Sequence, residues 1–249
     1  MKIGILGTGH IGKTLVLKLG AAGHEIKVAN SRGPETIPPD VLAGGACAVS
    51  AGDAVSDVDV AILSVPLIKL REIAPLLGRL RDDAVLIDTS NYYPQRDGHI
   101  ASIDAGLPES RWVVETLGRP VVKAWNAIGS DSFARLGKPA GSPGRIAVPV
   151  AADDQQHREV GLALVEETGF DGLDAGRLAD SWRQQPGTPA YCTDLLLDEL
   201  SAALLAAEAE RSPKRRDLAY AAVVERMTGS GARDPGAEYL VSLNRLLFM

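Results

Sequence analysis

The stretch KIGILGTGHIGKT, residues 2–14, decides the fold class. Its first five residues are mostly apolar, as in a buried strand, and they lead into Gly7, Gly9 and Gly12, which are spaced as G-x-G-x-x-G. Apolar residues then recur at helical spacing over residues 11–22. Between a strand and a helix, the first glycine permits a tight turn, the second lets a pyrophosphate approach the backbone, and the third allows close helix packing. The stretch therefore predicts a dinucleotide-binding unit.

The same residues also fit the phosphate-binding P-loop, because residues 7–14 read G-x-x-x-x-G-K-T. On that interpretation Lys13 would reach the β- and γ-phosphates, Thr14 would bind Mg²⁺, and Asp88 would hold the metal. The end of the next expected strand favours the dinucleotide. There Asn30-Ser31-Arg32 stands where an NAD-specific protein carries an acidic residue. A hydroxyl and a guanidinium can bind the 2′-phosphate of NADP, which a carboxylate would repel. A nucleoside triphosphatase remains the less favoured alternative.

Short apolar runs alternate with helix-length segments as far as about residue 176, which is typical of a doubly wound, mostly parallel Rossmann sheet in the α/β class. The runs at 60–63 and 85–87 are apolar throughout, so both faces of the sheet must be covered. Helices are expected over 11–22, 68–80 and 155–168, with Gly169 ending the last. Strands are expected at 2–6, 25–30, 46–50, 59–65, 84–88, 121–125, 146–151 and 170–174.

The segment Trp182–Pro189 interrupts this alternation with two prolines and a glycine. We therefore divide the chain into an NADP-binding domain of residues 1–180 and a helical C-terminal appendage of residues 181–249. Helices are expected over 191–209, from an N-capping Ser212 with Pro213 at the first position, and over 237–249. Leucines on the first of these form a stripe that is a candidate homodimer surface: Leu195, Leu196, Leu200 and Leu204.

Composition excludes several other classes of protein. The 249 residues carry 26 basic and 32 acidic side chains, a net charge of −6, which argues against nucleic-acid binding. Two cysteines, Cys47 and Cys192, and four scattered histidines match no disulfide framework or metal site. No apolar run approaches the roughly 20 residues that span a bilayer, and no signal-peptide core precedes Gly7. We expect a cytoplasmic protein without metal, nucleic-acid or membrane partners.

Four motifs together resemble the family of coenzyme-F420-dependent NADP oxidoreductases: the glycine loop, the Asn30-Ser31-Arg32 turn, the strand end at residues 61–66 and GLDAG at residues 172–176. The likeness extends in order over about the first 180 residues. It implies hydride transfer between NADP and F420, a flavin or another small redox acceptor. It also implies that the loop at Thr8, Gly9, His10 and Ile11 wraps the pyrophosphate, that Ser31 and Arg32 bind the 2′-phosphate, and that Ser64, Val65 and Pro66 lie against the nicotinamide.

Two asparagines follow expected strands at the edge where open α/β sheets bind ligands. Asn91 is expected either to orient the nicotinamide or an acceptor carbonyl, or to form a local turn bond, and Asn126 has the same two interpretations. Arg183, in the segment that leaves the sheet, is the candidate contact for an anionic acceptor.

No catalytic residue is identified, because neither Tyr-x-x-x-Lys nor Lys-x-x-x-Asn occurs. Transfer between two redox cofactors depends mainly on positioning, and solvent can supply the protons. A non-catalytic NADP sensor is the alternative from another class.

Overall fold

The computed structural model describes residues 1–228 and 236–249. Its eight strands form one sheet in the order β3-β2-β1-β4-β5-β6-β7-β8, and all neighbours are parallel except β6 and β7. The first six follow the order of doubly wound dinucleotide-binding sheets, which confirms the expected fold class. The strands are β1 Lys2–Leu6, β2 Glu25–Ala29, β3 Cys47–Ala48, β4 Val60–Leu63, β5 Val85–Asp88, β6 Val122–Lys123, β7 Ala147–Ala152 and β8 Asp171–Asp174.

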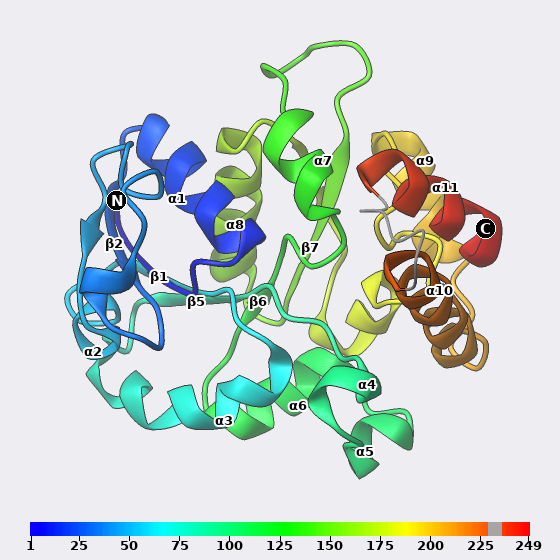
Figure 1. The fold of residues 1–249 in the computed structure, drawn as a ribbon, viewed down its shortest axis with the longest axis horizontal. Helices are drawn as coiled ribbons and strands as arrows, with labels where there is room; N and C mark the ends of the chain where they lie inside the picture. The colour runs from blue at the N-terminus through cyan, green and yellow to red at the C-terminus, as the bar shows by residue number, and fades with distance from the viewer. Residues whose placement is uncertain (229–235) are drawn as a thin grey trace.

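Helices cover both faces of the sheet (Figure 1). On one face lie α1 (His10–Ala21) and α8 (Gln155–Glu167), and on the other lie α2 (Ala51–Ala54), α3 (Leu70–Ile73) and α6 (Glu109–Leu117). The C-terminal helices α9 (Leu197–Leu205), α10 (Ser212–Met227) and α11 (Gly236–Phe248) group beyond β7 at one side of the molecule. The remaining short helices are α4 Pro94–Asp97, α5 Ala101–Asp104 and α7 Ser130–Arg135, with 3-10 turns at Pro34–Thr36, Leu67–Lys69, Ala74–Arg79 and Leu178–Gln184.

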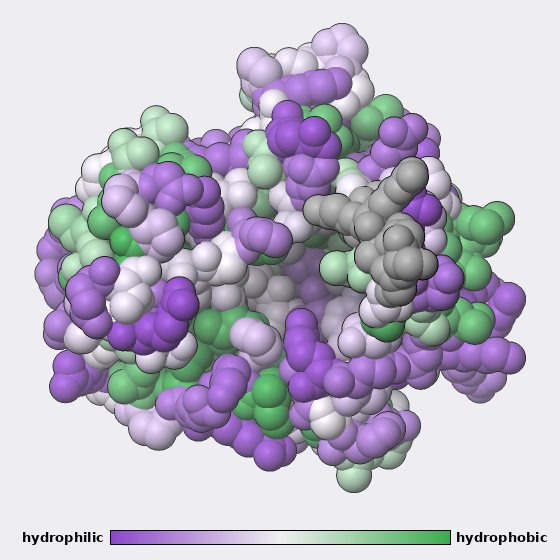
Figure 2. Space-filling view, viewed as in Figure 1, coloured by the Kyte–Doolittle hydropathy of each residue, from purple (hydrophilic) through white to green (hydrophobic). Residues whose placement is uncertain are grey.

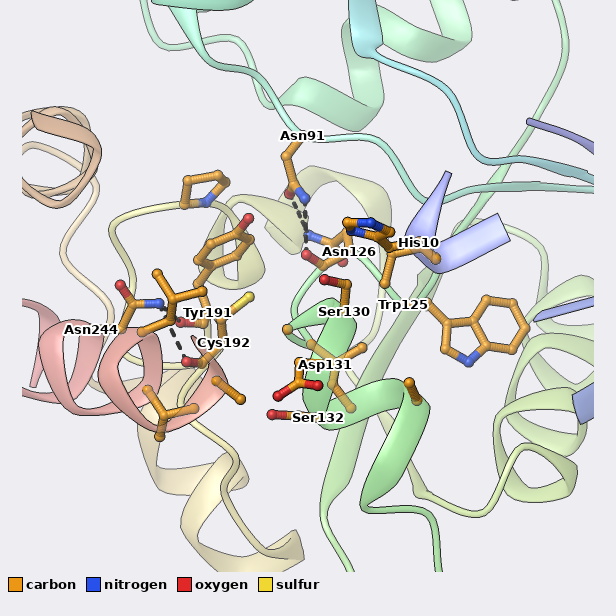
Figure 3. A pocket seen from close by; sticks show the side chains of 18 of the residues that line it. His10, Asn91, Trp125, Asn126, Ser130, Asp131, Ser132, Tyr191, Cys192 and Asn244 are labelled. Atoms are coloured by element: carbon orange, nitrogen blue, oxygen red, sulfur yellow. Dashed lines mark hydrogen bonds between the residues drawn. The ribbon is translucent and has the colours of Figure 1, made fainter. Parts of the chain in front are cut away.

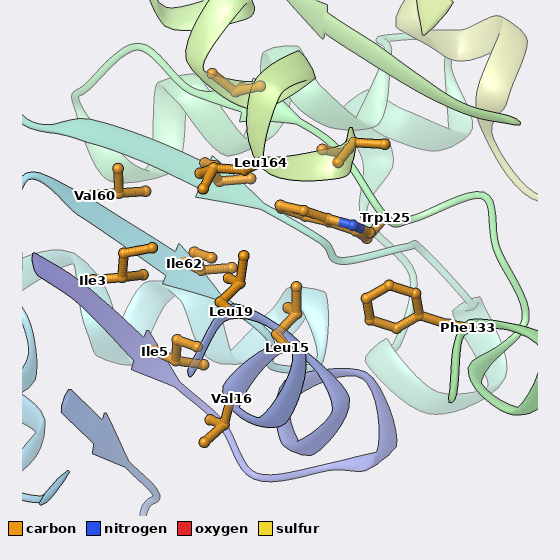
Figure 4. Packing of buried hydrophobic residues seen from close by; sticks show 14 of the residues in the cluster. Ile3, Ile5, Leu15, Val16, Leu19, Val60, Ile62, Trp125, Phe133 and Leu164 are labelled. Atoms are coloured by element: carbon orange, nitrogen blue, oxygen red, sulfur yellow. The ribbon is translucent and has the colours of Figure 1, made fainter. Parts of the chain in front are cut away.

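Alternate residues of each central strand enter opposite layers of the core. Ile3, Ile5 and Ile62 pack against α1 and α8, where Leu15, Leu19 and Leu164 are fully buried (Figure 4). Their neighbours along the strands, such as Ala61 and Leu63, pack into the second layer with Leu70 and Trp112. Both layers are apolar, and this explains the uninterrupted apolar runs of the sequence. Burial of each large aliphatic side chain contributes about 1.5–3 kcal/mol.

The helix expected over residues 68–80 is broken into three short pieces: Leu67–Lys69, Leu70–Ile73 and Ala74–Arg79. Pro75 lies near the start of the third piece. Proline has no backbone N–H for a helical hydrogen bond and its ring crowds the preceding turn, so one continuous helix cannot form. The prediction of a helical connection here is correct, but the prediction of one continuous helix is wrong.

The helix expected over residues 191–209 is also wrong in its first part, because α9 begins only at Leu197. Cys192 and Asp194 have φ of 51° and 50°, outside the helical region. The carbonyls of this segment are bound by other elements: Arg245 of α11 donates to Thr193 and Asp194, and the amide of Ala147 donates to Leu195. The expected leucine stripe therefore divides, with Leu195, Leu200 and Leu204 buried and Leu196 exposed.

Ser212 does not cap α10 as expected, because the helix begins at Ser212 and Arg211 is its N-cap residue. The Ser212 hydroxyl donates to the carbonyl of Glu208 at 2.7 Å instead. The helix expected over residues 237–249 is present as α11. Within the described part of the chain, every helix is too short or too polar to traverse a lipid bilayer.

The contact between β1 and α2 yields a prediction about stability. A Cβ on Gly4 would lie 1.7 Å from the carbonyl oxygen of Ala54, so Gly4→Ala forces two backbones apart and should lower the free energy of unfolding by about 3 kcal/mol. Gly78→Ala is the control, because a Cβ there meets nothing within 4 Å and should change stability by less than about 1 kcal/mol. Urea denaturation of both variants measures the difference, and equal losses would contradict this packing.

Candidate functional site

The glycine loop joins β1 to α1 through direct backbone packing. Gly7 has φ of 110°, and a Cβ on it would lie 2.1 Å from the carbonyl oxygen of Ser64; one on Gly12 would lie 2.1 Å from the carbonyl oxygen of Gly7. Gly9 differs, because its φ is −67° and a Cβ there would meet nothing within 4 Å. Neither strain nor packing requires glycine at this position. The open space in front of Gly9 is what a pyrophosphate needs to approach the backbone.

The N-terminus of α1 faces this space. Gly9 is the N-cap residue and offers no side-chain hydrogen bond, and no acidic residue lies in the first turn of the 12-residue helix. The free N–H groups and the positive end of the helix dipole therefore suit an anion. Ser64 and Val65 border the loop, since both would meet a Cβ added to Gly7, and Pro66 follows them exposed at the surface. The structure thus brings the expected loop and strand-end residues together.

The residues that a P-loop would use have other partners. The ammonium of Lys13 is ion-paired with Asp40, and the buried carboxylate of Asp88 is paired with Lys123 at 2.8 Å. The strand order is also that of a dinucleotide-binding sheet. These three observations count against the triphosphatase.

The Ser31-Arg32 turn lies at the end of β2, beside the strand that carries the glycine loop. The Asn30 side chain shapes it, accepting from the backbone N–H of Arg32 at 2.9 Å and donating to the hydroxyl of Thr36 at 2.9 Å. Ser31 and Arg32 are exposed. Among the described residues, no carboxylate pairs with the Arg32 guanidinium, so it is available to a phosphate.

A cavity of about 1140 Å³ lies between the strand ends and the C-terminal helices. The face in Figure 2 is hollowed at this place. The glycine-loop side contributes His10 and Ile11, and the strand ends contribute Asn91 and Asn126. The opposite wall comes from the same chain, through Pro186, Tyr191 and Cys192 and through apolar residues of α10 and α11: Val223, Leu240, Val241 and Phe248.

The two asparagines bind each other across the strand ends. Asn91 Nδ2 donates to the backbone carbonyl of Asn126 at 2.9 Å, and Asn126 Nδ2 donates to Asn91 Oδ1 at 3.1 Å (Figure 3). Gln184 completes the network, donating to Asn126 Oδ1 at 2.8 Å and accepting from Asn126 Nδ2 through its carbonyl at 2.8 Å. Asn91 therefore forms a bond between strands and not the local turn bond that was considered. Contacts of either amide with a bound ligand stay a prediction.

A buried ionic cluster supports the loop that carries Asn91. Lys123 and Asp88 are fully buried, and Lys123 Nζ also donates to the carbonyl of Ser90. Glu109 of α6 is buried nearby with its Oε2 lacking a hydrogen-bond partner among the described residues. Burial raises the pKa of the Glu109 carboxyl to about 7, and the Lys123 ammonium partly offsets that rise.

A pair of tyrosines in the cavity was not expected from the sequence. The hydroxyl of Tyr93 donates to that of Tyr191 at 3.0 Å, although the residues are 98 positions apart. Burial is the main reason that the pKa of each phenol lies above its usual range, so both stay protonated. Cys192 follows, and burial raises the pKa of its thiol to about 12. The sequence did not predict the Tyr93–Tyr191 pair, because the two residues are far apart in the chain and no short motif links them.

The segment that carries Tyr191 is clamped on two sides. The backbone N–H of Cys192 donates to the carbonyl of Ala127 at 2.9 Å, in the segment that follows β6. The side chain of Asn244 lies against the carbonyls of Tyr191 and Cys192, at 3.4 and 3.3 Å (Figure 3). Trp125, which also lines the cavity, shares with Cys192 a left-handed backbone, with φ of 54° and 51°. Such conformations cost free energy and concentrate at functional sites.

Arg183 does not line the cavity, contrary to the expectation that it meets an acceptor. Its guanidinium donates to the carbonyl of Leu204 at 3.1 Å and stacks on Trp182. The segment still contributes to the cavity, but through Pro186 and Tyr191. Within the described residues, no group of three or more histidine, cysteine, aspartate or glutamate side chains is placed to hold a metal ion.

Residues 2–92 match the model of a family described as NADP oxidoreductase, coenzyme F420-dependent. The resemblance stated above is thus confirmed over this segment, which is a dinucleotide-binding unit of the NADP-oxidoreductase type. The protein YjhV of Escherichia coli (strain K12) is 54% identical over 56 residues, which are 22% of this chain and 41% of that protein. The aligned region therefore covers about two fifths of the curated relative.

Two solved structures extend the likeness in fold. A hypothetical protein from Sinorhizobium meliloti is 27% identical, with a TM-score of 0.67 over 79% of this chain and 95% of that one. A proposed F420-dependent NADP reductase from Arthrobacter sp. FB24 is 20% identical, with a TM-score of 0.56 over 73% of this chain and 87% of that one. The second likeness concerns the fold alone.

Glu109 generates a prediction about pH. Its carboxyl has a pKa of about 7 in the folded protein, against 4.5 as its ordinary value, so unfolding releases a proton between these values and stability falls as the pH rises through them. Glu109→Gln removes this titration. We therefore subtract the free energy of unfolding of the unmodified protein from that of Glu109→Gln at each pH. This difference should rise by about 2 kcal/mol from about pH 5 to about pH 8.

Denaturation by urea at both pH values measures this gain. Glu115→Gln, the same change at an exposed position of α6, is the control and should show no such trend. A constant difference between the Glu109 variant and the unmodified protein would show that the carboxyl titrates normally.

Proposed function

We propose that this chain is an NADP(H)-dependent oxidoreductase whose hydride acceptor occupies the cavity beside the glycine loop. One observation carries the proposal: His10 and Ile11 continue directly from the open space at Gly9 and also line the cavity. A dinucleotide and a second ligand would therefore share a wall. Hydride transfer requires that closeness, because the reacting atoms must approach to about 3–3.5 Å.

The residues at the strand ends fit the parts of NADP. The space before Gly9 and the N-terminus of α1 suit the pyrophosphate, and the Arg32 guanidinium suits the 2′-phosphate. Ser64, Val65 and Pro66 stay the predicted neighbours of the nicotinamide. When bound, NADPH supplies a hydride at its nicotinamide ring. The acceptor in this proposal is F420, a flavin or another small hydride acceptor. The proposal also includes that the chain acts as a homodimer in the cytoplasm.

Arg32 provides the test of cofactor choice. NADP should bind at least tenfold more tightly than NAD, about 1.4 kcal/mol, because the guanidinium attracts the additional phosphate. Arg32→Asp should abolish or reverse this preference by replacing attraction with repulsion. Titration of each cofactor against protein fluorescence measures the affinities.

Arg211→Asp is the control, since it makes the same change at another exposed arginine, beside α10 and not at the β2 end. It should leave both affinities within a factor of about two. Equal affinities for NADP and NAD in the unmodified protein would refute the assignment. Tight NADP binding without NADPH oxidation by any acceptor would support the non-catalytic sensor instead.

Lys13 distinguishes the dinucleotide loop from a P-loop. Because its ammonium pairs with Asp40, Lys13→Ala should change NADP affinity by no more than a few fold. ATP hydrolysis should be undetectable in the unmodified protein. A phosphate-release assay with Mg²⁺ checks this, and ATP turnover that disappears in the variant would establish the triphosphatase.

A further inference from the structure

The Tyr191 hydroxyl is arranged to donate a proton into the cavity. It accepts the hydrogen bond of Tyr93 at 3.0 Å, so its own proton is directed elsewhere. The thiol of the adjacent Cys192 is only a weak hydrogen-bond acceptor and competes little with an oxygen atom of a ligand. Tyr191 and Cys192 are both partly accessible from the cavity. Figure 3 shows them facing the same space as Asn126 and His10.

The charges of the cavity are already matched within the protein. Four of the five lysines and arginines that line it among the described residues are ion-paired, with partners Asp40, Asp97, Asp131 and Asp217. The fifth, Lys18, lies over the rings of Phe133 and Phe170, and its burial lowers its pKa. An anionic acceptor would have to displace these partners. A neutral ligand with an apolar substituent suits the aliphatic wall of α10 and α11 better.

We propose that the acceptor is a neutral aldehyde or ketone, and that Tyr191 binds its oxygen and protonates it. The proposal rests on the NADP(H)-dependent function above and narrows its acceptor. It also supplies what the sequence did not reveal, a residue that can act as a general acid.

The reaction balances as the reduction of a carbonyl compound. Tyr191 gives its hydroxyl proton to the substrate oxygen while the hydride of NADPH forms the new C–H bond and the π pair of the C=O bond moves to that oxygen. The products are an alcohol and NADP⁺, and Tyr191 is left as a phenolate. Tyr93 then passes its own proton to Tyr191 and regains one from water, since it is partly exposed.

Tyr93 therefore acts as a positioning and relay residue. Its hydrogen bond fixes the Tyr191 hydroxyl, and the Arg96 guanidinium lies 5.5 Å from the centre of its ring. That cation favours the transient negative charge as the proton passes along the pair. The relay also explains why two phenols lie in contact at the wall of a largely apolar cavity.

The experiment compares reduction of benzaldehyde, cyclohexanone and oxidised F420 by NADPH, followed as loss of NADPH absorbance. The unmodified protein should reduce a carbonyl compound. Tyr191→Phe should lower its kcat at least 100-fold, the usual effect of losing a general acid, and leave NADPH affinity unchanged. Tyr93→Phe should lower kcat less and leave KM unchanged. Tyr239→Phe, a tyrosine of α11 outside the cavity lining, should match the unmodified protein.

Two further measurements separate proton donation from a structural role. An N-methylated cyclic iminium ion needs a hydride but no proton, so the ratio of aldehyde to iminium reduction should fall in Tyr191→Phe. Benzamide, an unreactive carbonyl probe, should bind the NADP complex about 3- to 10-fold more weakly in this variant, as measured by calorimetry. Tyr191→Phe must first show unchanged circular dichroism.

The outcomes are distinguishable. Failure of the unmodified protein to bind NADPH would refute the proposed function itself. NADPH binding with reduction of F420 alone would overturn only the carbonyl proposal. NADPH binding with reduction of no acceptor would overturn both the carbonyl proposal and the oxidoreductase function. Aldehyde reduction by Tyr191→Phe at the unmodified rate would overturn the role of Tyr191.

Discussion

The buried ion pair between Lys123 and Asp88 is the interaction on which the ligand-binding edge of the sheet depends. β5 and β6 are joined by only two registered residue pairs, and the second of these is Asp88 with Lys123. Their side chains meet at 2.8 Å with no exposure to solvent. Loss of one partner from such a pair costs about 3–5 kcal/mol, because an unpaired charge is left inside the protein. The segments that follow β5 and β6, which carry Asn91 and Asn126, are therefore held together by charge more than by backbone pairing.

The other segments of the site are hydrogen-bonded to residues that follow β6. Asn126, three residues after the end of β6, binds Asn91 on one side and Gln184 on the other. The next residue, Ala127, accepts the hydrogen bond that places Cys192 and hence Tyr191. The segment that follows the two-residue strand β6 thus carries the contacts of three other segments.

Local patterns in the sequence were sufficient to predict the strands of the sheet. The apolar runs around Ile3, Ile62 and Ile87 predicted strands because both faces of each strand are buried, and the glycine loop predicted the first crossover. Edge strands were less well bounded, and the run at 46–50 shortens to Cys47–Ala48 where it has one neighbour only. The Ser31-Arg32 turn was also visible from its position relative to the glycines. In these places the physical cause lies within a few residues.

The far wall of the cavity could not be predicted in the same way. Residues 191–196 were expected to begin a helix, but α11 and β7 bind their carbonyls, and these partners lie about 50 residues away in the sequence. The Tyr93–Tyr191 pair spans 98 residues. Arg183 was expected to contact a ligand, but its guanidinium donates to the carbonyl of Leu204 instead. Tertiary contacts overrode local preference at each of these positions.

The reversed direction of β7 has a consequence for how the protein works at low abundance. Because β7 is antiparallel to β6, its first residue, Ala147, reaches past the end of β6 and holds Leu195 beside the cavity. The described residues of one chain therefore build both the cofactor side and the opposite wall. An enzyme that borrows a wall from a second subunit loses catalytic power on dilution, as its assemblies dissociate. If the proposed reaction takes place in this cavity, the activity per chain is expected to stay constant on dilution, because both walls belong to one chain.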